Sequence, residues 1–517
     1  MRFLFIFLMV INIVGCNGGS SPENNSLTPE PGNEYVREES FELVEGQKHT
    51  LKPYIIEHDF DDMKWTQTCG VPILKDDDSS SLTIDFLAPE SDQDETYCID
   101  FTGSHGKDKY IKSYKVTVTA PTLEVYIDHA SLPTLQQLMH IVRVYDKNNT
   151  TQRFVSWARI KLTEKAKDDL NIKTFPLKGN NTSPELISAI SNYIENMNRV
   201  NVQIFSNTAH SFSNISPIIR SLSSLDNAKI TKIELSDDGS AEYMNLFSWK
   251  NTANKLEQLT SGSKVLSDYL DGQSDIVPEY PSSIYGWHKL YNADYLFLRK
   301  DYLDVEGDLH ELRDYLGGSL KQMAWDQFST MSSDKQKLLL SIVGFDKAEI
   351  EQQYNSSPLP NFIFTGTTTW SGGETREFYA KQQVNVINNA INETSPYYIG
   401  EDVDLFFKGH PRGGDINDYI VNSFSDIKSI PSNISFEILM MTGMLPDKIA
   451  GIASSLYFTI PGDKVDFIVF TSTDDIADRE AALKSPLVQV MLKLNIVKES
   501  NILFWSDLPN CETGVCV

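Results

Sequence analysis

The spacing of hydrophobic and polar positions changes once along the chain, near residue 120. From about residue 35 to that point, apolar and polar residues alternate in short runs, which is typical of half-buried β-strands. Turn-rich stretches such as residues 75–81 separate the runs. The clearest runs are residues 40–43, 82–86, 97–101 and 110–118. This pattern predicts a small all-β domain over residues 35–120.

Two aromatic residues and two cysteines lie within this first part of the chain: Trp65, Cys69, Tyr97 and Cys98. They would fix a small sandwich of immunoglobulin-like type, although the spacing between the two cysteines is short for that fold. The segment carries no convergent group of titratable side chains. We therefore expect residues 35–120 to be a spacer or docking module.

After residue 120, strand-like runs alternate with helical periodicity. Strands are predicted at residues 123–127, 154–157, 200–205 and 230–235, and helices at 132–144, 184–197, 215–222 and from 243 onward. The following stretch, residues 256–354, is predicted to be a largely helical connection. Strands separated by helices predict a parallel, doubly wound sheet. We therefore expect a first Rossmann-like lobe over residues 121–355.

A second series of the same kind follows. Strands are predicted at residues 361–364, 405–407, 465–470 and 502–505, and helices at 382–391, 418–424, 437–441 and 488–494. This series predicts a second Rossmann-like lobe over residues 356–517. The fold class is therefore α/β, with two facing Rossmann-like lobes, a cleft between them, and the small β-sandwich in front.

The N-terminus has the features of a targeting segment. Arg2 precedes an apolar run over residues 3–14 that is too short to span a bilayer comfortably. The run ends at Cys16, as in a bacterial lipoprotein signal, so residues 1–16 would be the signal and Cys16 the lipidated residue. Residues 17–34 are rich in Gly, Ser, Asn and Pro and predict a flexible tether. We expect an exported lipoprotein on the outer membrane; an ordinary signal peptide is the alternative.

Four cysteines remain when Cys16 is set aside: Cys69, Cys98, Cys511 and Cys516. An even number in an exported protein indicates disulfides, and proximity in sequence favours pairing Cys69 with Cys98 and Cys511 with Cys516. A zinc site built from all four is less favoured, because the two pairs lie at opposite ends of the chain.

Length and charge narrow the function classes. The chain has 517 residues, which is too many for a single core, and its formal net charge is −26. Such a charge argues against nucleic-acid binding, and an anionic substrate would need a locally positive site. Lys408, His410 and Arg412 directly follow a predicted strand and supply such a site, which would suit a phosphate. A solvated basic turn is the alternative.

Other polar residues also follow predicted strands. Asp128, His129, Arg159, Asn207, His210, Asp237 and Asp238 follow the strands of the first lobe. They would all lie at one edge of the sheet, although each alone is compatible with a helix cap or turn. Residues 451–455 bring two serine hydroxyls to an expected helix start, where phosphates bind. Neither a nucleotide-hydrolase loop nor a dinucleotide fingerprint is present.

Six motifs in a fixed order carry a strong resemblance to the marine, two-Rossmann type of bacterial sialyltransferases. They are Tyr126-Ile-Asp-His-Ala-Ser-Leu-Pro133, Asp237-Asp-Gly-Ser-Ala-Glu-Tyr243, Phe364-Thr-Gly-Thr-Thr-Thr-Trp370, Phe407-Lys-Gly-His-Pro-Arg-Gly-Gly414, Ser435-Phe-Glu-Ile-Leu-Met-Met441 and Ala453-Ser-Ser-Leu-Tyr457. The resemblance runs from about residue 123 to the end of the chain. It implies a glycosyltransferase of type B that moves sialic acid from CMP-sialic acid to a galactoside such as lactose, with inversion.

The resemblance also implies donor-binding residues. His410 would act as an acid or a phosphate partner, and Ser454 and Ser455 would bind the CMP phosphate. Glu437 would bind the ribose hydroxyls. The backbone around Gly366, Lys408 and Pro411 would face cytosine.

On the acceptor side, the resemblance implies that Asp238 is the general base and that Trp370 lies over the acceptor sugar. Arg159 and His210 match by order as substrate contacts, and His129 and Ser131 complete the acceptor-side set. No cofactor and no metal are expected; magnesium held by Asp237, Asp238 and Glu242 is the alternative.

The linkage and the class of protein leave further alternatives. The resemblance implies an α-2,6 linkage rather than α-2,3, because His129 follows Asp128 where α-2,3 members of the family often have another residue. A sugar-binding lipoprotein of periplasmic type would explain the tether and the cleft, but not a facing aspartate and histidine. A structural adhesin rests on the β-sandwich alone.

Overall fold

The computed structural model describes residues 32–53, 60–74, 81–145, 150–368, 375–470, 476–511 and 516. Cys16, Trp370 and almost all of the expected signal and tether lie outside these residues. The chain forms two compact units, one built from β-strands before residue 119 and one that comprises essentially everything after it. No helix within the described ranges is long and apolar enough to cross a membrane.

The first unit is a small β domain, as the alternating pattern predicts. One sheet has the strand order β1(Glu34–Val44), β6(Asp108–Thr119), β5(Glu95–His105), β3(Asp62–Cys69), and β2(Lys48–Leu51) pairs with β4(Ile84–Leu87). Trp65, Ile99 and Phe101 are buried in its core. The predicted Cys69–Cys98 disulfide is present and joins the neighbouring strands β3 and β5 of one sheet. It therefore differs from the immunoglobulin disulfide, which joins two sheets.

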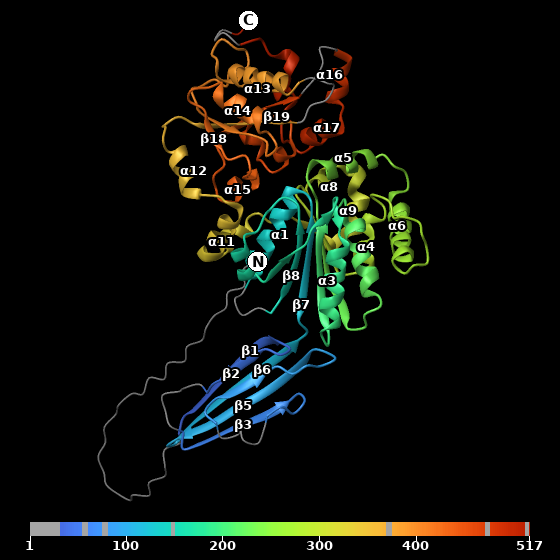
Figure 1. Cartoon of the computed structure of the whole chain (residues 1–517), viewed down its shortest axis with the longest axis vertical. Coiled ribbons are helices and arrows are strands. Elements are labelled where there is room, and N and C mark those ends of the chain that lie inside the picture. Colours follow the sequence, from blue (N-terminus) through green and yellow to red (C-terminus); the bar gives the residue numbers. More distant parts are fainter. Residues whose placement is uncertain are drawn as a thin grey trace, which may run out of the picture. The chain divides into compact units, whose positions relative to one another are not determined.

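The second unit begins with a parallel seven-stranded sheet with helices on both faces (Figure 1). Its strand order is β15(Leu320–Gln322), β14(Ala293–Phe297), β13(Ala228–Ser236), β12(Val200–Asn207), β7(Thr122–Asp128), β8(Gln152–Trp157), β9(Ile172–Thr174). Its main helices are α1(Ser131–Val144), α3(Pro184–Glu195), α4(Ser211–Leu222), α5(Ser240–Trp249) and α6(Lys255–Leu270). Local signals fix helix starts: the Ser183 hydroxyl caps α3 and Pro184 occupies its first turn.

The connection over residues 256–354 is not as helical as the sequence predicts, because it supplies β14 and β15 to the sheet. The helices of this connection are short: α7(Trp287–Leu290), α8(Tyr302–Val305), α9(His310–Leu316), α10(Gln327–Thr330), α11(Ser333–Val343) and α12(Lys347–Tyr354). Another short helix, α2(Glu164–Asp169), lies earlier in the chain, between β8 and β9. Residues 309–323 have helical spacing in the sequence, but α9 ends at Leu316 because Gly317 takes a positive φ of 50°. A strand of three residues at a sheet edge leaves almost no period in the sequence.

The second lobe is built on a parallel sheet, as predicted, but the sheet has six strands where the sequence predicts four. Its strand order is β18(Lys428–Ile430), β17(Asp404–Lys408), β16(Asn361–Thr365), β19(Lys448–Ile452), β20(Val465–Phe470), β21(Ile502–Phe504). Its helices after α12 are α13(Arg376–Ile391), α14(Asp415–Asn422), α15(Phe436–Met441), α16(Ile476–Leu483) and α17(Pro486–Lys493). The two sheets confirm the prediction of two Rossmann-like lobes.

One element at the centre of this sheet differs from the prediction. Residues 448–452 form the strand β19, so the expected helix start at residues 451–455 includes the end of a strand. Only a four-residue 3-10 helix, η5(Ser455–Phe458), follows it. Gly451 has a φ of 144°, and a Cβ built on it would lie 2.2 Å from the Thr365 carbonyl oxygen. Glycine is therefore required where the chain leaves β19 toward the two serines.

Packing connects the two lobes within this unit. α11 lies against α1, whereas the Tyr354 hydroxyl at the end of α12 donates to the Met444 carbonyl at 3.1 Å. The late helix α17 packs on α5 of the first lobe (Figure 1). The last part of the sequence thus returns to the first lobe.

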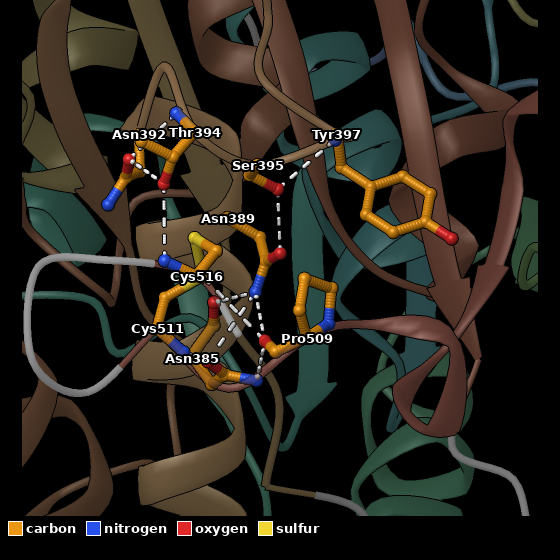
Figure 2. The surroundings of a disulfide bond; sticks show 9 residues. All are labelled: Asn385, Asn389, Asn392, Thr394, Ser395, Tyr397, Pro509, Cys511 and Cys516. Carbon is orange, nitrogen blue, oxygen red and sulfur yellow. Dashed lines mark hydrogen bonds between the residues drawn. A yellow bond between two sulfur atoms is a disulfide. The ribbon is translucent and has the colours of Figure 1, made fainter.

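The C-terminal tail is held against α13 by polar contacts, and the predicted Cys511–Cys516 disulfide closes a short loop within the tail (Figure 2). The side-chain amides of Asn385 and Asn389 donate to the Pro509 carbonyl at 3.1 and 2.9 Å. The Cys516 backbone N–H donates to the Thr394 hydroxyl at 3.1 Å. Both predicted disulfides therefore form, one in each unit.

Replacing Gly451 with alanine should destabilise the fold. The added Cβ would overlap the Thr365 backbone, and the cost of such overpacking is about 1–3 kcal/mol. Thermal unfolding of Gly451→Ala measures this loss. Gly307→Ala is the matched control, since nothing lies within 4 Å of a Cβ at that position. Equal melting temperatures for Gly451→Ala and the wild type would contradict the local geometry.

Candidate active site

The sequence-predicted residues of the first lobe lie at one edge of its sheet. Asp238, His210, His129 and Arg159 follow β13, β12, β7 and β8, which are neighbours in the strand order. The rings of His129 and His210 meet edge to face with centroids 4.5 Å apart. The Arg159 Nε donates to the His129 carbonyl oxygen at 3.0 Å. These four residues therefore form one group.

Asp237 holds the turn that presents Asp238. Its Oδ1 accepts from the Gly239 backbone N–H at 3.0 Å, and its Oδ2 accepts from the Leu298 N–H at 2.6 Å and from the Tyr243 hydroxyl at 2.5 Å. Gly239 has a φ of 100°, a conformation that L side chains rarely adopt. The two adjacent aspartates therefore have different positions: Asp237 faces inward, and Asp238 is only partly buried.

The Asp238 carboxylate has the properties of a general base. Its Oδ1 is buried and accepts no hydrogen bond from the residues that the structure describes. Burial raises the pKa of Asp238, and the nearby His129 and His210 partly oppose the rise. A carboxylate with a raised pKa is a stronger base than an ordinary aspartate.

Three further carboxyl groups around Asp238 are fully buried. Burial raises the pKa of Asp128 and of Asp237 to about 7, and that of Glu242 to about 8. Glu242 accepts hydrogen bonds from the hydroxyls of Tyr280 and Tyr285. These carboxyls face separate partners, and within the described ranges no three His, Cys, Asp or Glu side chains are grouped as metal ligands.

His410 follows β17 in the second lobe and has a defined proton position. Its Nδ1 accepts from the Arg412 backbone N–H at 3.1 Å, and the Thr368 hydroxyl lies 3.2 Å from the same nitrogen. A backbone N–H can only donate, so the proton of the neutral ring is on Nε2. Burial and the cations Arg412, Lys408 and Arg159 lower the pKa of His410.

Lys408 and Glu437 are buried beside this turn. The Lys408 Nζ donates to the Ser432 carbonyl at 2.9 Å, and burial lowers its pKa to about 8 while Glu437 opposes the shift. Burial raises the pKa of Glu437, which lies in the first turn of α15. The Gly366 N–H donates to the Lys408 carbonyl at 3.0 Å, and a Cβ at Gly366 would lie 2.8 Å from the Phe407 ring. At Gly366 and Lys408 the two chain segments are therefore joined through their backbones, with no room for a side chain at residue 366.

Ser454 and Ser455 leave the end of β19 and meet the base turn of the first lobe. A Cβ built on Gly239 would lie 3.4 Å from the Cβ of Ser455. Next to this contact, the Tyr243 ring stacks on the Phe458 ring at 5.1 Å. The candidate base and the two serines therefore belong to a single site that both lobes build.

The remaining predicted residues lie around a cavity. Ser131 at the start of α1, Arg159 and Pro411 line a cavity of about 390 Å³ together with apolar residues such as Leu135 and Ile438. Burial lowers the pKa of Arg159, and the positive charge of the nearby Arg412 lowers it further. Trp370 is outside the described residues.

Four residues of the site were not predicted as functional. They are Asn207, Tyr243, Thr368 and Gln383. The Gln383 side chain accepts from the Thr367 N–H at 2.9 Å and donates to the Thr367 carbonyl at 3.1 Å. Tyr243 and Thr368 lie inside recognised motifs, and Asn207 follows a predicted strand. Their place in the sequence could therefore have marked these three as site residues. Gln383 lies mid-helix and gives no such signal.

Two Rossmann-like lobes that join a carboxylate base to a cationic, hydroxyl-bearing turn define a glycosyltransferase of the two-lobe type. Residues 123–501 match the family model described as Sialyltransferase PMO188. The chain belongs to this sialyltransferase family. The comparison with curated protein sequences found no match.

Solved structures of sialyltransferases resemble the chain over most of its length. One from Photobacterium damsela is 58% identical, with a TM-score of 0.88, over 91% of this chain and 100% of its own. A 2,6-sialyltransferase from Photobacterium sp. JT-ISH-224 is 53% identical, with a TM-score of 0.80, over 93% and 99%. An α-2,3-sialyltransferase from Photobacterium phosphoreum is 31% identical, with a TM-score of 0.64, over 75% and 100%.

Glu242→Gln should become more stable relative to the wild type as pH rises. The pKa of Glu242 is raised from 4.5 to about 8 in the folded state, so the folded protein holds this proton where the unfolded chain has lost it. The unfolding free energy of the wild type therefore falls through that pH window, by at most about 1.4 kcal/mol per pH unit from this group. Glutamine keeps the acceptor for both tyrosines and does not titrate.

The measurement is the difference in melting temperature between Glu242→Gln and the wild type across the same pH window. Glu257→Gln makes the same change at an exposed position on α6. A pH-independent difference for Glu242→Gln would show that this carboxyl does not hold its proton.

Proposed function

We propose that this sialyltransferase transfers sialic acid from CMP-sialic acid to a galactoside such as lactose, with inversion and with an α-2,6 linkage. Its family membership supports sialyl transfer. The substrate assignment is supported by the Photobacterium sp. JT-ISH-224 enzyme, which is described in complex with the donor product CMP and the acceptor substrate lactose.

The observation that carries the proposal is the contact between the turn of Asp238 and the loop of Ser455. The two loops come so close at Gly239 that a Cβ built on this residue would lie within van der Waals distance of Ser455. A donor phosphate on the serines and an acceptor hydroxyl on Asp238 would thus be neighbours. This arrangement is what a direct displacement between two bound sugars needs.

Asp238 would activate the acceptor. Its carboxylate takes the proton of the galactose hydroxyl as the hydroxyl oxygen bonds to C2 of sialic acid. The bond between C2 and the phosphate oxygen breaks at the same time, and its electron pair leaves with CMP. Attack from the face opposite CMP inverts the configuration at C2.

The second lobe would stabilise the leaving phosphate. The hydroxyls of Ser454 and Ser455 and the Nε2–H of His410 are donors for the charge that develops on it. The pKa of His410 is lowered in the protein alone, and a phosphate dianion nearby would raise it again. His410 can therefore also protonate the phosphate as CMP departs.

The remaining assignments follow the family motifs. Glu437 would bind the ribose, and the backbone of Gly366, Lys408 and Pro411 would face cytosine. On the acceptor side, the assigned residues are His129, Ser131, Arg159, His210 and Trp370. The cations Arg159 and Arg412 supply positive potential for the carboxylate of sialic acid in a chain of net charge −26.

The α-2,6 linkage is favoured over α-2,3 by two observations. His129 lies against His210 beside Asp238, where it limits how galactose can present a hydroxyl to the base. The identity to the 2,6-specific relative is 53%, against 31% to the 2,3-specific one.

Asp238→Asn should reduce turnover of CMP-sialic acid with lactose by about a hundred- to ten-thousand-fold, because the amide cannot accept the proton. CMP affinity, measured by calorimetry, should be unchanged. Asp226→Asn, at the exposed turn before β13, is the matched control and should keep full turnover. Near-normal turnover of Asp238→Asn would refute the base assignment; loss of wild-type turnover in EDTA with recovery in magnesium would instead indicate metal ligands.

The linkage is tested on the product made from CMP-sialic acid and lactose. We expect the carbon-13 resonance of galactose C6 to move on sialylation, because O6 becomes glycosylated. Lactose that lacks the galactose 6-hydroxyl should accordingly fail as an acceptor. A shift at galactose C3 instead would establish the α-2,3 linkage and overturn the assignment.

A further inference from the structure

Asn207 occupies the middle of the acceptor-side edge. It is the last residue of β12, which lies between β7 and β13 in the sheet, and its side chain is fully buried. The loops after these strands carry His129, His210 and Asp238. An amide in this position can contact the loops on both sides of its own strand.

The orientation of the Asn207 amide is fixed by its partners. Its Oδ1 accepts from the His210 backbone N–H at 2.7 Å. Its Nδ2 lies 3.2 Å from Oδ1 of Asp128, which is also fully buried. A backbone N–H can only donate, so the oxygen of the amide must face His210 and the nitrogen must face Asp128.

The same nitrogen determines the proton position on His129. Asn207 Nδ2 lies 3.4 Å from His129 Nδ1. An amide nitrogen donates and does not accept, so Nδ1 has to offer its lone pair. The proton of the neutral imidazole is then on Nε2, the ring nitrogen turned away from Asn207.

We propose that Asn207 is a positioning residue for the acceptor, which holds His129 as its Nε2–H tautomer and fixes the backbone of His210 beside it. This inference rests on the proposed transfer to a galactoside and concerns how the galactose is oriented. With this tautomer, His129 offers a donor to a sugar hydroxyl or ring oxygen. With the other tautomer it would offer a lone pair, and the sugar would have to turn.

The position of His129 makes this choice relevant to the reaction. Asp238 and His129 interact electrostatically, and the His129 ring packs against that of His210. Galactose bound by the His129 N–H can direct one hydroxyl to the Asp238 carboxylate. Asn207 itself is buried behind the two histidines, so it acts through them.

The first test reads the tautomer directly in the wild-type full chain. Long-range proton–nitrogen NMR of the nitrogen-15-labelled protein separates protonated from unprotonated ring nitrogens, and His129→Gln assigns the signals. We expect His129 to be neutral, with its proton on Nε2, without any substrate. A His129 with its proton on Nδ1 would overturn the inference.

The second test replaces the amide by a carboxylate of the same shape. In Asn207→Asp the atom beside His129 Nδ1 becomes a carboxyl oxygen that also faces Asp128, so at a pH at which both carboxyls are ionised it is an acceptor, and His129 should become protonated on Nδ1. The KM for lactose should rise about tenfold, as for loss of one or two oriented hydrogen bonds, while the KM for CMP-sialic acid changes less than about twofold. An unchanged His129 signal in the folded variant would also overturn the inference.

Asn214→Asp is the matched control. Asn214 is equally buried in the same lobe, and its Nδ2 donates to the Ser206 hydroxyl at 2.9 Å. The Asn214→Asp variant should be less stable than the wild type. Its His129 tautomer and its ratio of KM for lactose to KM for CMP-sialic acid should be unchanged. If Asn207→Asp does not fold, the wild-type spectrum alone decides.

The experiments distinguish a failure of the proposed function from a failure of the role proposed for Asn207. A chain that shows the Nε2–H tautomer but transfers no sialic acid would refute the proposed function and leave the effect of Asn207 on the His129 tautomer intact. A chain that transfers sialic acid with the opposite tautomer would refute the role of Asn207 only.

Discussion

Tyr243 joins the two halves of the candidate site more directly than any other described residue we identify. Its hydroxyl donates to Asp237, which holds the turn before Asp238, and its ring stacks on Phe458, three residues after Ser455. The Tyr243 hydroxyl also accepts from the Arg299 N–H at 2.6 Å. The position of the candidate base and the approach of the serine loop therefore depend on one buried side chain, and the site requires both lobes to be packed together.

Charge is the second constraint on this site. In the proposed reaction, an acidic chain has to accept a donor that carries a phosphate and a carboxylate. Lys408, Arg412 and Arg159 supply local positive charge, and the buried carboxyls Asp128, Asp237 and Glu242 have raised pKa values that favour their neutral forms. The raised pKa values thus reduce the negative charge of these three carboxyls around Asp238. Burial, which is costly for most carboxylates, here limits repulsion of the donor.

Much of the fold could be predicted from the sequence, because strong period-2 and period-3.6 patterns recur in order. Both disulfides and most strands of the two sheets were predicted. The strands β9, β14, β15, β18 and β19 were missed, since a strand of three to five residues has no readable period. Motif order brought Asp238, His410 and the serines into the candidate site. It gave no indication of Gln383, and Asn207 was noted only as a strand-end residue, because their roles depend on contacts between distant segments.

A structure of the full chain with CMP and lactose tests the central claim most directly. The account predicts CMP phosphate oxygens on the Ser454 and Ser455 hydroxyls and the galactose O6 at about 2.6–3.2 Å from an Asp238 carboxylate oxygen. The two ligands should occupy the same cleft, on opposite sides of the Gly239–Ser455 contact. Lactose beyond hydrogen-bond reach of Asp238, or CMP away from the two serines, would contradict it.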